Sequence, residues 1–218
     1  MITRQMPGTA TNSQFAQPRH LQAFRYAIAG VFMKRLIDLS VSCIFLILFA
    51  VPMLLVALAI RLTSKGPILY WSSRIGRNNQ IFRMPKFRSM RIETPLLPSD
   101  RLINAASFVT PVGRVLRRTS IDELPQLFSV IRGHMSLVGP RPALANQTDL
   151  IALRTERGIH RLLPGITGWA QINGRDYLPT PQKVRMDHQY LNTSSCLFDL
   201  KILCITAAKV VLCEDVSH

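Results

Sequence analysis

Residues 39–60, LSVSCIFLILFAVPMLLVALAI, form a run of 22 residues without a charged side chain. A helix needs about 20 apolar residues to cross the hydrocarbon core of a bilayer, so this run predicts a helix in a membrane. The run begins late in the chain and no small-residue cleavage site follows it, which argues against a secretory signal peptide. The simplest interpretation is one helix that crosses the bilayer.

A second interpretation is a helix that enters the bilayer, bends and returns to the same side. Pro52 lies inside the run, where it removes one backbone hydrogen bond and clashes with the preceding turn, so a kink is expected there. Short basic segments favour the cytoplasmic side of a membrane, and only a re-entrant hairpin keeps both flanks there. From the residues alone, both topologies stay open. The basic residues are Arg25, Lys34 and Arg35 before the run, and Arg61, Lys65, Arg74 and Arg77 after it.

The composition excludes some protein classes. The chain has 218 residues, with 27 Lys and Arg against 12 Asp and Glu, a net charge of +15. Hydrophobic residues make up 48% of it, which excludes a disordered chain. Positive mean hydropathy, +0.18, together with a strong positive charge is unusual in a simple soluble enzyme and indicates an anionic membrane surface or phosphate ligands. The four cysteines have no metal-site spacing and are expected to be reduced, as on a cytoplasmic face.

The remaining patterns predict an α-rich α+β fold with a small domain after the membrane-associated helix. Residues 1–20 are expected to be a mobile tail, residues 21–62 a membrane-associated helix with a possible break near Gly30, and residues 63–213 the small domain, which the resemblance given below implies is cytoplasmic and catalytic. Short β-rich runs between turn signals predict a hairpin within residues 63–92. The other expectations are loops at 93–110 and 164–177, an extended or turned segment at 139–142, helices at 145–161, 181–192 and 198–212, and a tail at 214–218. The last helix is largely apolar and could pack on the membrane helix or lie in the interface.

One adjacent carboxylate pair stands out, Asp122 and Glu123. Ser120 and Glu123 match a capping box, and Leu124, Leu127, Phe128 and Ile131 follow at helical spacing. Pro125 is tolerated only in a first turn, so the helix could instead begin there. Arginines surround the pair, an arrangement that can hold a divalent cation and phosphate. The alternative is a structural pair that complements a helix dipole.

The sequence also contains a run of basic residues. Between Arg61 and Ile92 there are eight basic residues and no acidic one, with aromatic residues interleaved. Such a run suits a solvated face, a lipid-headgroup surface or a nucleotide-phosphate site, and composition favours the headgroup surface. Because the run adjoins a membrane segment, nucleic acid is not expected as a partner.

Several motifs in order resemble the bacterial sugar transferase family, the monotopic phosphoglycosyl transferases. They are LTSKGPILY at 62–70, RIGRNNQIF at 74–82, KFRSM at 86–90, GRVLRRTSIDELPQL at 113–127, RGHMSLVGPRP at 132–142, PGITGWAQINGR at 164–175 and FDLKIL at 198–203. The resemblance covers about residues 32–213. It implies a re-entrant membrane helix kinked near Pro52, and a ping-pong reaction in which a UDP-sugar gives its sugar 1-phosphate to a polyprenyl phosphate such as undecaprenyl phosphate and releases UMP.

The resemblance also implies roles for individual residues. Asp122 matches the nucleophile that carries the phosphosugar, and Glu123 matches a ligand of Mg²⁺, the expected cofactor. Arg117 in RxxSxDE and Arg141 in GPRP match phosphate-binding positions, and the further matches are Lys86, Arg88 and Arg175. Mg²⁺ and arginines would neutralise the phosphate oxygens, a helix N-terminus would add a positive field, and positive surroundings would keep the nucleophile ionised.

Three departures from the family pattern are visible. Val51 stands where the family often has Ser before the kinking proline, so the bend must rest on Pro52. His134 replaces the Asp of a GDMS motif, which weakens any role of that carboxylate at the metal. Ser194, Ser195 and Cys196 replace aromatic residues before the FDLKIL stretch.

The leading hypothesis is therefore an enzyme of the bacterial inner membrane, with its catalytic domain on the cytoplasmic face, that initiates surface glycan assembly. The alternative is a non-catalytic, membrane-anchored basic domain that binds anionic lipid or nucleic acid. The expected partners are a UDP-sugar, polyprenyl phosphate and inner-membrane lipid, and a homo-oligomer stays open. The stretch INGRDYLPTPQKV resembles that of members that use UDP-linked N-acetylated hexoses, which makes such a sugar the expected one.

Overall fold

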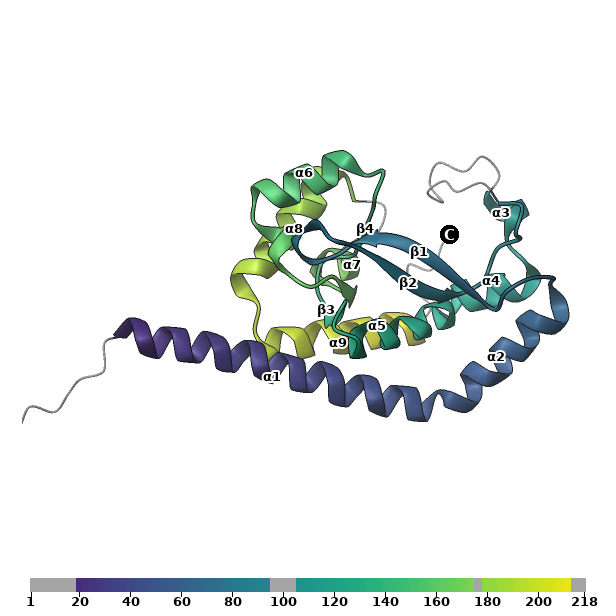
Figure 1. The fold of residues 1–218 in the computed structure, drawn as a ribbon, viewed down its shortest axis with the longest axis horizontal. Helices are drawn as coiled ribbons and strands as arrows, with labels where there is room; N and C mark the ends of the chain where they lie inside the picture. Colours follow the sequence, from purple (N-terminus) through teal and green to yellow (C-terminus); the bar gives the residue numbers. More distant parts are fainter. Residues whose placement is uncertain (1–18, 95–104, 175–177, 213–218) are drawn as a thin grey trace, which may run out of the picture.

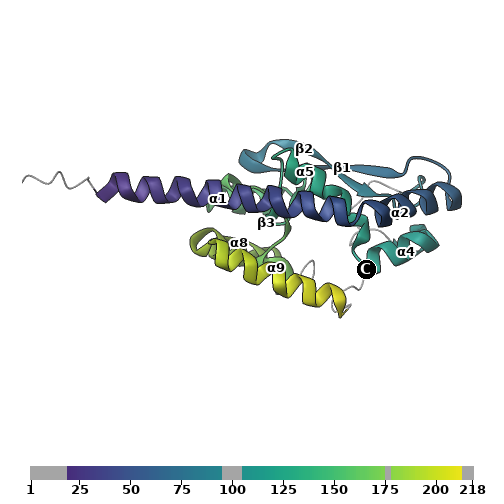
Figure 2. The same cartoon turned by 90° about the horizontal axis from the view of Figure 1, so that it is seen from below.

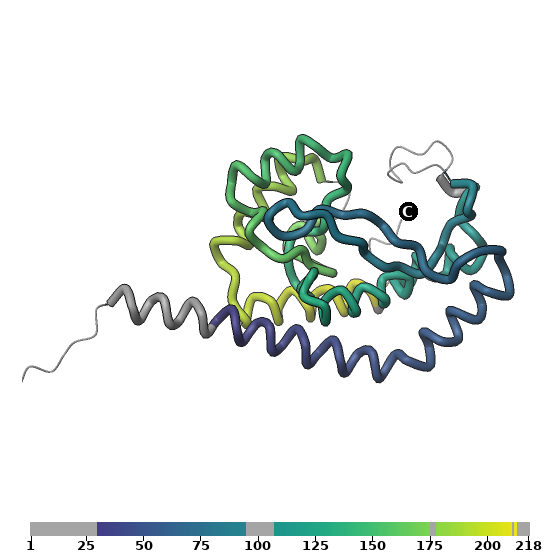
Figure 3. The backbone as a smooth tube through the Cα atoms, in the orientation of Figure 1, coloured from purple at the N-terminus to yellow at the C-terminus, as the bar shows by residue number. Residues whose placement is uncertain are grey.

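Two helices joined end to end form a bent rod along one side of the molecule (Figure 1 and Figure 3). The computed structural model describes residues 19–94, 105–174 and 178–212. Arg175, the tail expected at 214–218 and residues 1–18 of the tail expected at 1–20 lie outside these ranges, whereas Arg19 and His20 begin a helix. Helix α1 runs over Arg19–Leu48 and α2 over Ala50–Thr63, which confirms the helix expected at 21–62. The expected break near Gly30 is wrong: α1 continues through it, since one Gly costs a helix only about 1 kcal/mol.

The rod bends by 60° at Phe49, between α1 and α2. Pro52 explains the position of the bend, because it has no N–H to give to the Leu48 carbonyl four residues earlier. Regular bonding resumes at once, and Met53 N donates to Phe49 O at 2.8 Å. Among the described residues, no helix taken singly has the length and apolar character to cross a bilayer, whereas the bent pair has them when both parts are counted.

Most of the rod's outer surface is apolar and exposed. Ile47 and Leu54 are 78% and 70% exposed, and other large apolar residues of both helices are also exposed. The inner side of α2 is different, because Ile60 is buried against Phe87 and Leu116 of the domain that follows it. The rod is thus anchored to the domain at its α2 end and leaves an apolar face uncovered.

The expected hairpin is present. Strands β1 (Leu69–Ile75) and β2 (Ile81–Phe87) pair in antiparallel fashion, and the short β4 (Ala143–Leu144) extends the sheet in the order β2-β1-β4. A second, parallel pair joins β3 (Ser136–Val138) to β5 (Gly165–Thr167). The loop expected at 164–177 is therefore partly wrong, since it contains β5 and the short helix α7 (Trp169–Ile172).

Helices flank the two sheets. The expected helices are confirmed as α6 (Thr148–Glu156) with the 3₁₀ turn η4 (Ile159–Arg161), α8 (Thr180–Thr193) and α9 (Cys196–Val211). Two further ones, α3 (Ala105–Phe108) and α4 (Pro111–Arg118), precede the carboxylate pair, so the described part of the segment expected as a loop at 93–110 ends in a helical turn. The helix-rich α+β class is thereby confirmed.

Helix α9 lies beside α1, as Figure 2 shows from below, so packing of the last helix on the helix that contains the apolar run is confirmed. The main core between α9, β3 and the hairpin includes the fully buried Val130, Met135 and Ile202. Cys43, Cys196 and Cys204 are free, which agrees with the reduced state expected for them, and Cys213 lies outside the described residues.

Candidate active site

The carboxylate pair lies on a short 3₁₀ helix, η3 (Ile121–Gln126), which packs against β2. The expected capping box is wrong: Ser120 has a left-handed backbone, φ 56°, and its side chain caps nothing. Pro125 is the reason, because an α-helix over these residues would need a Pro125 N–H for the carbonyl of Ile121. The α-helix α5 starts only at Leu127 and ends at Ile131.

Two further expectations are wrong: the set of residues on the buried helical face, and the positive field of a helix N-terminus at the carboxylates. Helix α5 buries Leu127 and Val130, whereas Phe128, expected on the buried face, is 46% exposed. Because η3 and α5 are both short, a helix N-terminus adds little positive field at the pair. Side-chain cations must therefore provide most of the positive potential at this site.

Arg117 reaches the pair from α4. Thr110 caps α4 by accepting from Gly113 N at 2.9 Å, and Gly113 touches the backbone of Ser89 so closely that a Cβ would lie 1.9 Å from Ser89 O. This contact places the last turn of α4 beside Ser89, whose Oγ accepts from Arg117 Nε at 3.0 Å. Burial lowers the pKa of Arg117, and the attraction of Asp122 opposes that shift in part.

Lys86 and Arg141 reach Glu123 from two other segments. Lys86, near the end of β2, donates from Nζ to Glu123 Oε1 at 2.6 Å. Nη1 of Arg141 lies 3.8 Å from the same oxygen. Three cations that lie 24 to 55 residues apart in the sequence, at 86, 117 and 141, thus converge on adjacent carboxylates.

Asp122 is the buried member of the pair, with 8% of its surface exposed. Burial raises its pKa to about 6, and the neighbouring charge of Glu123 adds to the rise, while Lys86, Arg117 and Arg141 lower it. Positive surroundings alone would lower the pKa of Asp122, but the loss of hydration on burial has the larger effect and raises it. With this pKa the carboxylate is still mainly ionised at neutral pH.

Arg141 is held by a pair of residues that sequence reasoning missed. Its carbonyl accepts from Arg154 Nη1 at 2.8 Å, and Arg154 is paired with buried Asp187 through contacts of 3.0 and 2.6 Å. An open cavity of about 210 Å³ is lined in part by Glu123, and a second of about 350 Å³ shares Arg141 with it. Arg154 lies on α6 and Asp187 on α8, and no sequence motif links these helices. The sequence therefore could not predict that this pair holds Arg141. The first cavity is lined by Arg74, Met84, Lys86, Glu123, Gln126, Arg141, Pro142, Gly165 and Ile166.

Two other expected site residues lie elsewhere or cannot be placed. Arg88 is 7% exposed and turns away from the pair, where its Nη2 donates to Ser64 O and Oγ at the end of α2. Arg175 lies outside the described residues. His134, which replaces a family aspartate, is exposed on the turn before β3, with its ring 5.9 Å from that of Phe82.

The donor set fits Mg²⁺ in one particular way. The described residues contain no group of three or more His, Cys, Asp or Glu side chains that could hold a metal by themselves. Mg²⁺ commonly keeps several waters and is bound through one or two carboxylates together with substrate phosphates. The adjacent carboxylates of Asp122 and Glu123 match that pattern, with Lys86 as the cation that holds Glu123 when no metal is bound.

Comparison with known proteins gives relatives of similar sequence. The chain is 45% identical over 194 residues to an undecaprenyl-phosphate glucose phosphotransferase of Komagataeibacter xylinus, which covers 84% of this chain and 36% of that protein. It is 39% identical to an uncharacterized sugar transferase, EpsL, of Bacillus subtilis, over 85% of this chain and 91% of EpsL. It is 36% identical to a UDP-N-acetylgalactosamine-undecaprenyl-phosphate N-acetylgalactosaminephosphotransferase of Aeromonas hydrophila, over 79% of this chain and 42% of that protein.

The chain thus spans only about two fifths of the length of the two relatives named for a sugar, but nearly all of EpsL. The family described as bacterial sugar transferase matches residues 29–213, which include the bent helix pair, the hairpin and the carboxylate pair. By this match and by the relatives, the chain belongs to the bacterial sugar transferase family.

Proposed function

We propose that this protein is a phosphoglycosyl transferase that moves a sugar 1-phosphate from a UDP-sugar to a polyprenyl phosphate, undecaprenyl phosphate in bacteria. One observation carries the proposal: a buried aspartate, mainly ionised at neutral pH, lies next to Glu123 and among three cations, and Glu123 lines an open cavity together with Lys86 and Arg141. Asp187 is also buried with a raised pKa, but Arg154 pairs with it directly, whereas at Asp122 the loss of hydration would make a nucleophile more reactive.

The proposed reaction has two steps. A carboxylate oxygen of Asp122 attacks the phosphorus that carries the sugar, the bond between the two phosphates breaks, and UMP leaves with the bridging oxygen. A phosphate oxygen of the polyprenyl phosphate then attacks the same phosphorus and breaks its bond to Asp122, which gives a polyprenyl diphosphate sugar. Each step exchanges one phosphorus–oxygen bond for another, so no oxidant or further co-reactant is needed.

The other residues of the site position and neutralise the diphosphate. Arg141 can hold two phosphate oxygens through its planar guanidinium group, and Arg117 is oriented by Ser89 beside the nucleophile. Glu123 and Asp122 would hold Mg²⁺ together with substrate phosphates, and the ion would neutralise charge on the phosphate oxygens. Lys86, released from Glu123, would then be available to the departing UMP.

The proposal includes a place in the cell. The exposed apolar face of α1 and α2 fits a re-entrant hairpin in the inner membrane, with the bend at Phe49 inside the bilayer and both ends on the cytoplasmic side. Leu197 and Leu200 of α9 are exposed beside α1 and fit the interface. The site would then face cytoplasmic UDP-sugars and meet a lipid phosphate at the membrane surface, where surface glycan assembly begins.

The sugar is the least constrained part of the proposal. An N-acetylated hexose is our expectation from the sequence, and one relative is named for N-acetylgalactosamine while another is named for glucose. The decisive experiment is a panel of UDP-glucose, UDP-N-acetylglucosamine and UDP-N-acetylgalactosamine with undecaprenyl phosphate and Mg²⁺, scored by UMP release. Release with one of them supports the enzyme. A purified, folded protein that binds anionic vesicles but releases no UMP with any sugar would support the alternative, a non-catalytic basic membrane anchor.

Topology is tested separately. Single cysteines engineered near residues 10 and 216 should both resist an impermeant thiol reagent added to intact cells, in a background that lacks the native cysteines. Pro52→Leu should straighten the rod and increase the labelled fraction at one end. Labelling of only one end in the parent protein would show a spanning helix and remove the hairpin from the proposal.

A further inference from the structure

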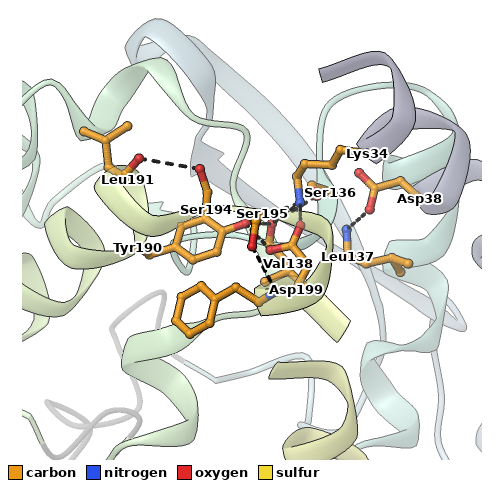
Figure 4. Close-up of polar contacts among 11 residues, drawn as sticks. Lys34, Asp38, Ser136, Leu137, Val138, Tyr190, Leu191, Ser194, Ser195 and Asp199 are labelled. Atoms are coloured by element: carbon orange, nitrogen blue, oxygen red, sulfur yellow. Dashed lines mark hydrogen bonds and ion pairs between the residues drawn. The ribbon is translucent and has the colours of Figure 1, made fainter. Parts of the chain in front are cut away.

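One turn of α1 carries three charged residues that bind the catalytic domain, although they directly precede the apolar run. Nζ of Lys34 forms an ion pair with Asp199 of α9 at 2.6 Å (Figure 4). The same ammonium group donates to the Val138 carbonyl at 3.1 Å and to the hydroxyl of Tyr190 at 3.3 Å. It therefore ties α1 to a strand and to two helices at once.

The other two residues of the turn also reach backbone groups. Asp38, which is 3% exposed, accepts from Leu137 N at 3.1 Å, so β3 is held by both Lys34 and Asp38 (Figure 4). Arg35 donates from its two terminal nitrogens to the carbonyls of Val130 and Ile131, at 2.7 and 2.9 Å. These carbonyls lie at the end of α5, where Val130 O also accepts from Gly133 N at 3.0 Å.

The two segments held in this way are the ones that carry opposite sides of the site. Helix α5 follows η3 directly, so Arg35 holds the segment that carries Asp122 and Glu123. Strand β3 leads within three residues to Arg141. The link is rigid, because Gly139 N donates to Thr167 O at 2.9 Å and a Cβ on Gly139 would lie 2.4 Å from Leu163 O.

Tyr190 completes the cluster as a neutral donor. Burial raises its pKa, and the negative charge of Asp199 raises it further, so the hydroxyl keeps its proton. It donates to Asp199 Oδ1 at 2.6 Å, while Lys34 occupies Oδ2. Asp199 thus accepts one proton donor on each oxygen, which fixes the rotamer of Lys34 against Val138.

We propose that this turn of the membrane helix is a positioning element, in which Lys34, Asp38 and Asp199 set the place of Arg141 relative to the carboxylate pair. The inference rests on the proposed function, since it assigns Arg141 to the substrate diphosphate. A shift of about 1 Å at a positioned catalytic group can reduce the rate by up to about a hundredfold. A membrane helix that moved relative to the domain would therefore lower activity without touching substrate.

The test is a double-mutant cycle on the full chain in lipid nanodiscs. Asp199→Asn places an amide N–H₂ against either Lys34 or Tyr190, both of which are donors, while Asp149→Asn makes the same change on an exposed side chain of α6 and serves as the control. Asp199→Asn should reduce kcat about tenfold, with a smaller change in KM for the UDP-sugar. In an Arg141→Lys background, whose flexible ammonium needs no fixed orientation, the same change should reduce kcat less than about twofold.

Equal reductions in both backgrounds would overturn the inference, because a general loss of folding does not depend on residue 141. Hydrogen exchange gives a readout that needs no activity: amides of residues 136–142 should exchange faster in Asp199→Asn than in Asp149→Asn, and unchanged exchange also overturns it. Tyr190→Phe, which removes the hydrogen bonds of the hydroxyl to Asp199 and Lys34 and keeps the ring, replaces Asp199→Asn if that variant does not fold. Wild type that releases no UMP would refute the proposed function alone, and the exchange data would still decide the positioning.

Discussion

Two of the clusters of acids and cations in the described residues differ in how their charges are satisfied. At the junction of α1 and α9, Asp199 accepts from Lys34 and from Tyr190, each at 2.6 Å, and each partner has further bonds. At η3, Asp122 is the more buried acid of the pair and lies among four charges, while two of its neighbours bond elsewhere: Lys86 to Glu123, and Arg117 to Ser89.

The difference separates a structural cluster from a reactive one. Where each polar atom has a short, directed partner, the charges hold elements together. Where an acid is buried with its pKa raised to about 6, its ionised form is held at a cost in stability, which is typical of functional sites. The same kind of substitution should therefore have opposite consequences at the two clusters.

The largest expected effect is on activity. Asp122→Asn keeps the size and polarity of the side chain but removes the anion, so it cannot attack phosphorus. UMP release should fall by at least about a thousandfold. Wild type incubated with its UDP-sugar and no lipid should gain the mass of one sugar phosphate within residues 120–126, and Asp122→Asn should not. If Asp122 only capped a helix, Asn would serve about as well.

The control for this prediction is Asp149→Asn, which should keep wild-type activity. Both variants should insert into membranes and elute as folded protein. A fully active Asp122→Asn protein, free of contaminating wild-type enzyme, would return the pair to a structural role and remove the nucleophile from the proposal.

The second expected effect is on the free energy of unfolding, which should rise in Asp122→Asn and fall in Asp199→Asn. Asp122→Asn should raise the free energy of unfolding at pH 8 by up to about 3 kcal/mol, the cost of two pKa units. Asp199→Asn should lower it by about 1.5–3 kcal/mol, because it disrupts hydrogen bonds to charged groups. Thermal unfolding of both variants in one detergent measures the signs directly, and a lower Tm for Asp122→Asn would contradict the cost assigned to its burial.

Much of the fold could be predicted from local patterns. The uncharged run predicted the long helices, Pro52 predicted the bend, and turn signals predicted the hairpin, because each depends on neighbouring residues. Strands β3, β4 and β5 are two or three residues long and pair with distant partners, so no period could reveal them. The capping box failed because Pro125 removes a hydrogen bond on which an α-helix there depends.

The site was predictable in type and not in arrangement. Adjacent carboxylates among arginines indicated metal and phosphate chemistry, and the structure brings Lys86, Arg117 and Arg141 to them. Arg88 instead donates a hydrogen bond to Ser64 at the end of α2. The roles of Lys34 and Asp38 were hidden, because charges before an apolar run are expected to mark a membrane boundary rather than contacts with a strand.

The third effect is a pH dependence. The folded-state pKa of Asp122 is raised from 3.8 to about 6, so the folded protein binds this proton more tightly than the unfolded chain. Its contribution to stability therefore declines as pH rises from about 4 to about 6, and the advantage of Asp122→Asn should vanish below pH 4. Activity has the opposite trend, since only the ionised form attacks: kcat/KM should fall about tenfold per pH unit below pH 6.

The pH dependence is best measured on UMP release without lipid. The polyprenyl phosphate is a phosphate monoester that itself titrates near pH 6, and it would obscure the decline of the rate at low pH, the acid limb. A limb near pH 4 would show that burial does not raise the pKa of the nucleophile. In that case the pKa of Asp122 would be that of a solvated acid. The proposed difference between a costly buried charge at Asp122 and a satisfied charge at Asp199 would then have no support.

The smallest effect separates the neighbours of Asp122. The charge of Glu123 raises the pKa of Asp122, whereas that of Lys86 lowers it, so Glu123→Gln should move the acid limb to lower pH and Lys86→Met to higher pH, each by up to about one unit. Residual UMP release, measured from pH 4.5 to about 8 at saturating Mg²⁺, reports both shifts. Glu123→Gln should also raise the Mg²⁺ concentration needed for half-maximal rate, while leaving Asp122 able to form the phosphosugar adduct. Shifts in the same direction for both variants would mean that each acts by disturbing η3 rather than through its charge, because the ion pair between Lys86 and Glu123 is lost in either case.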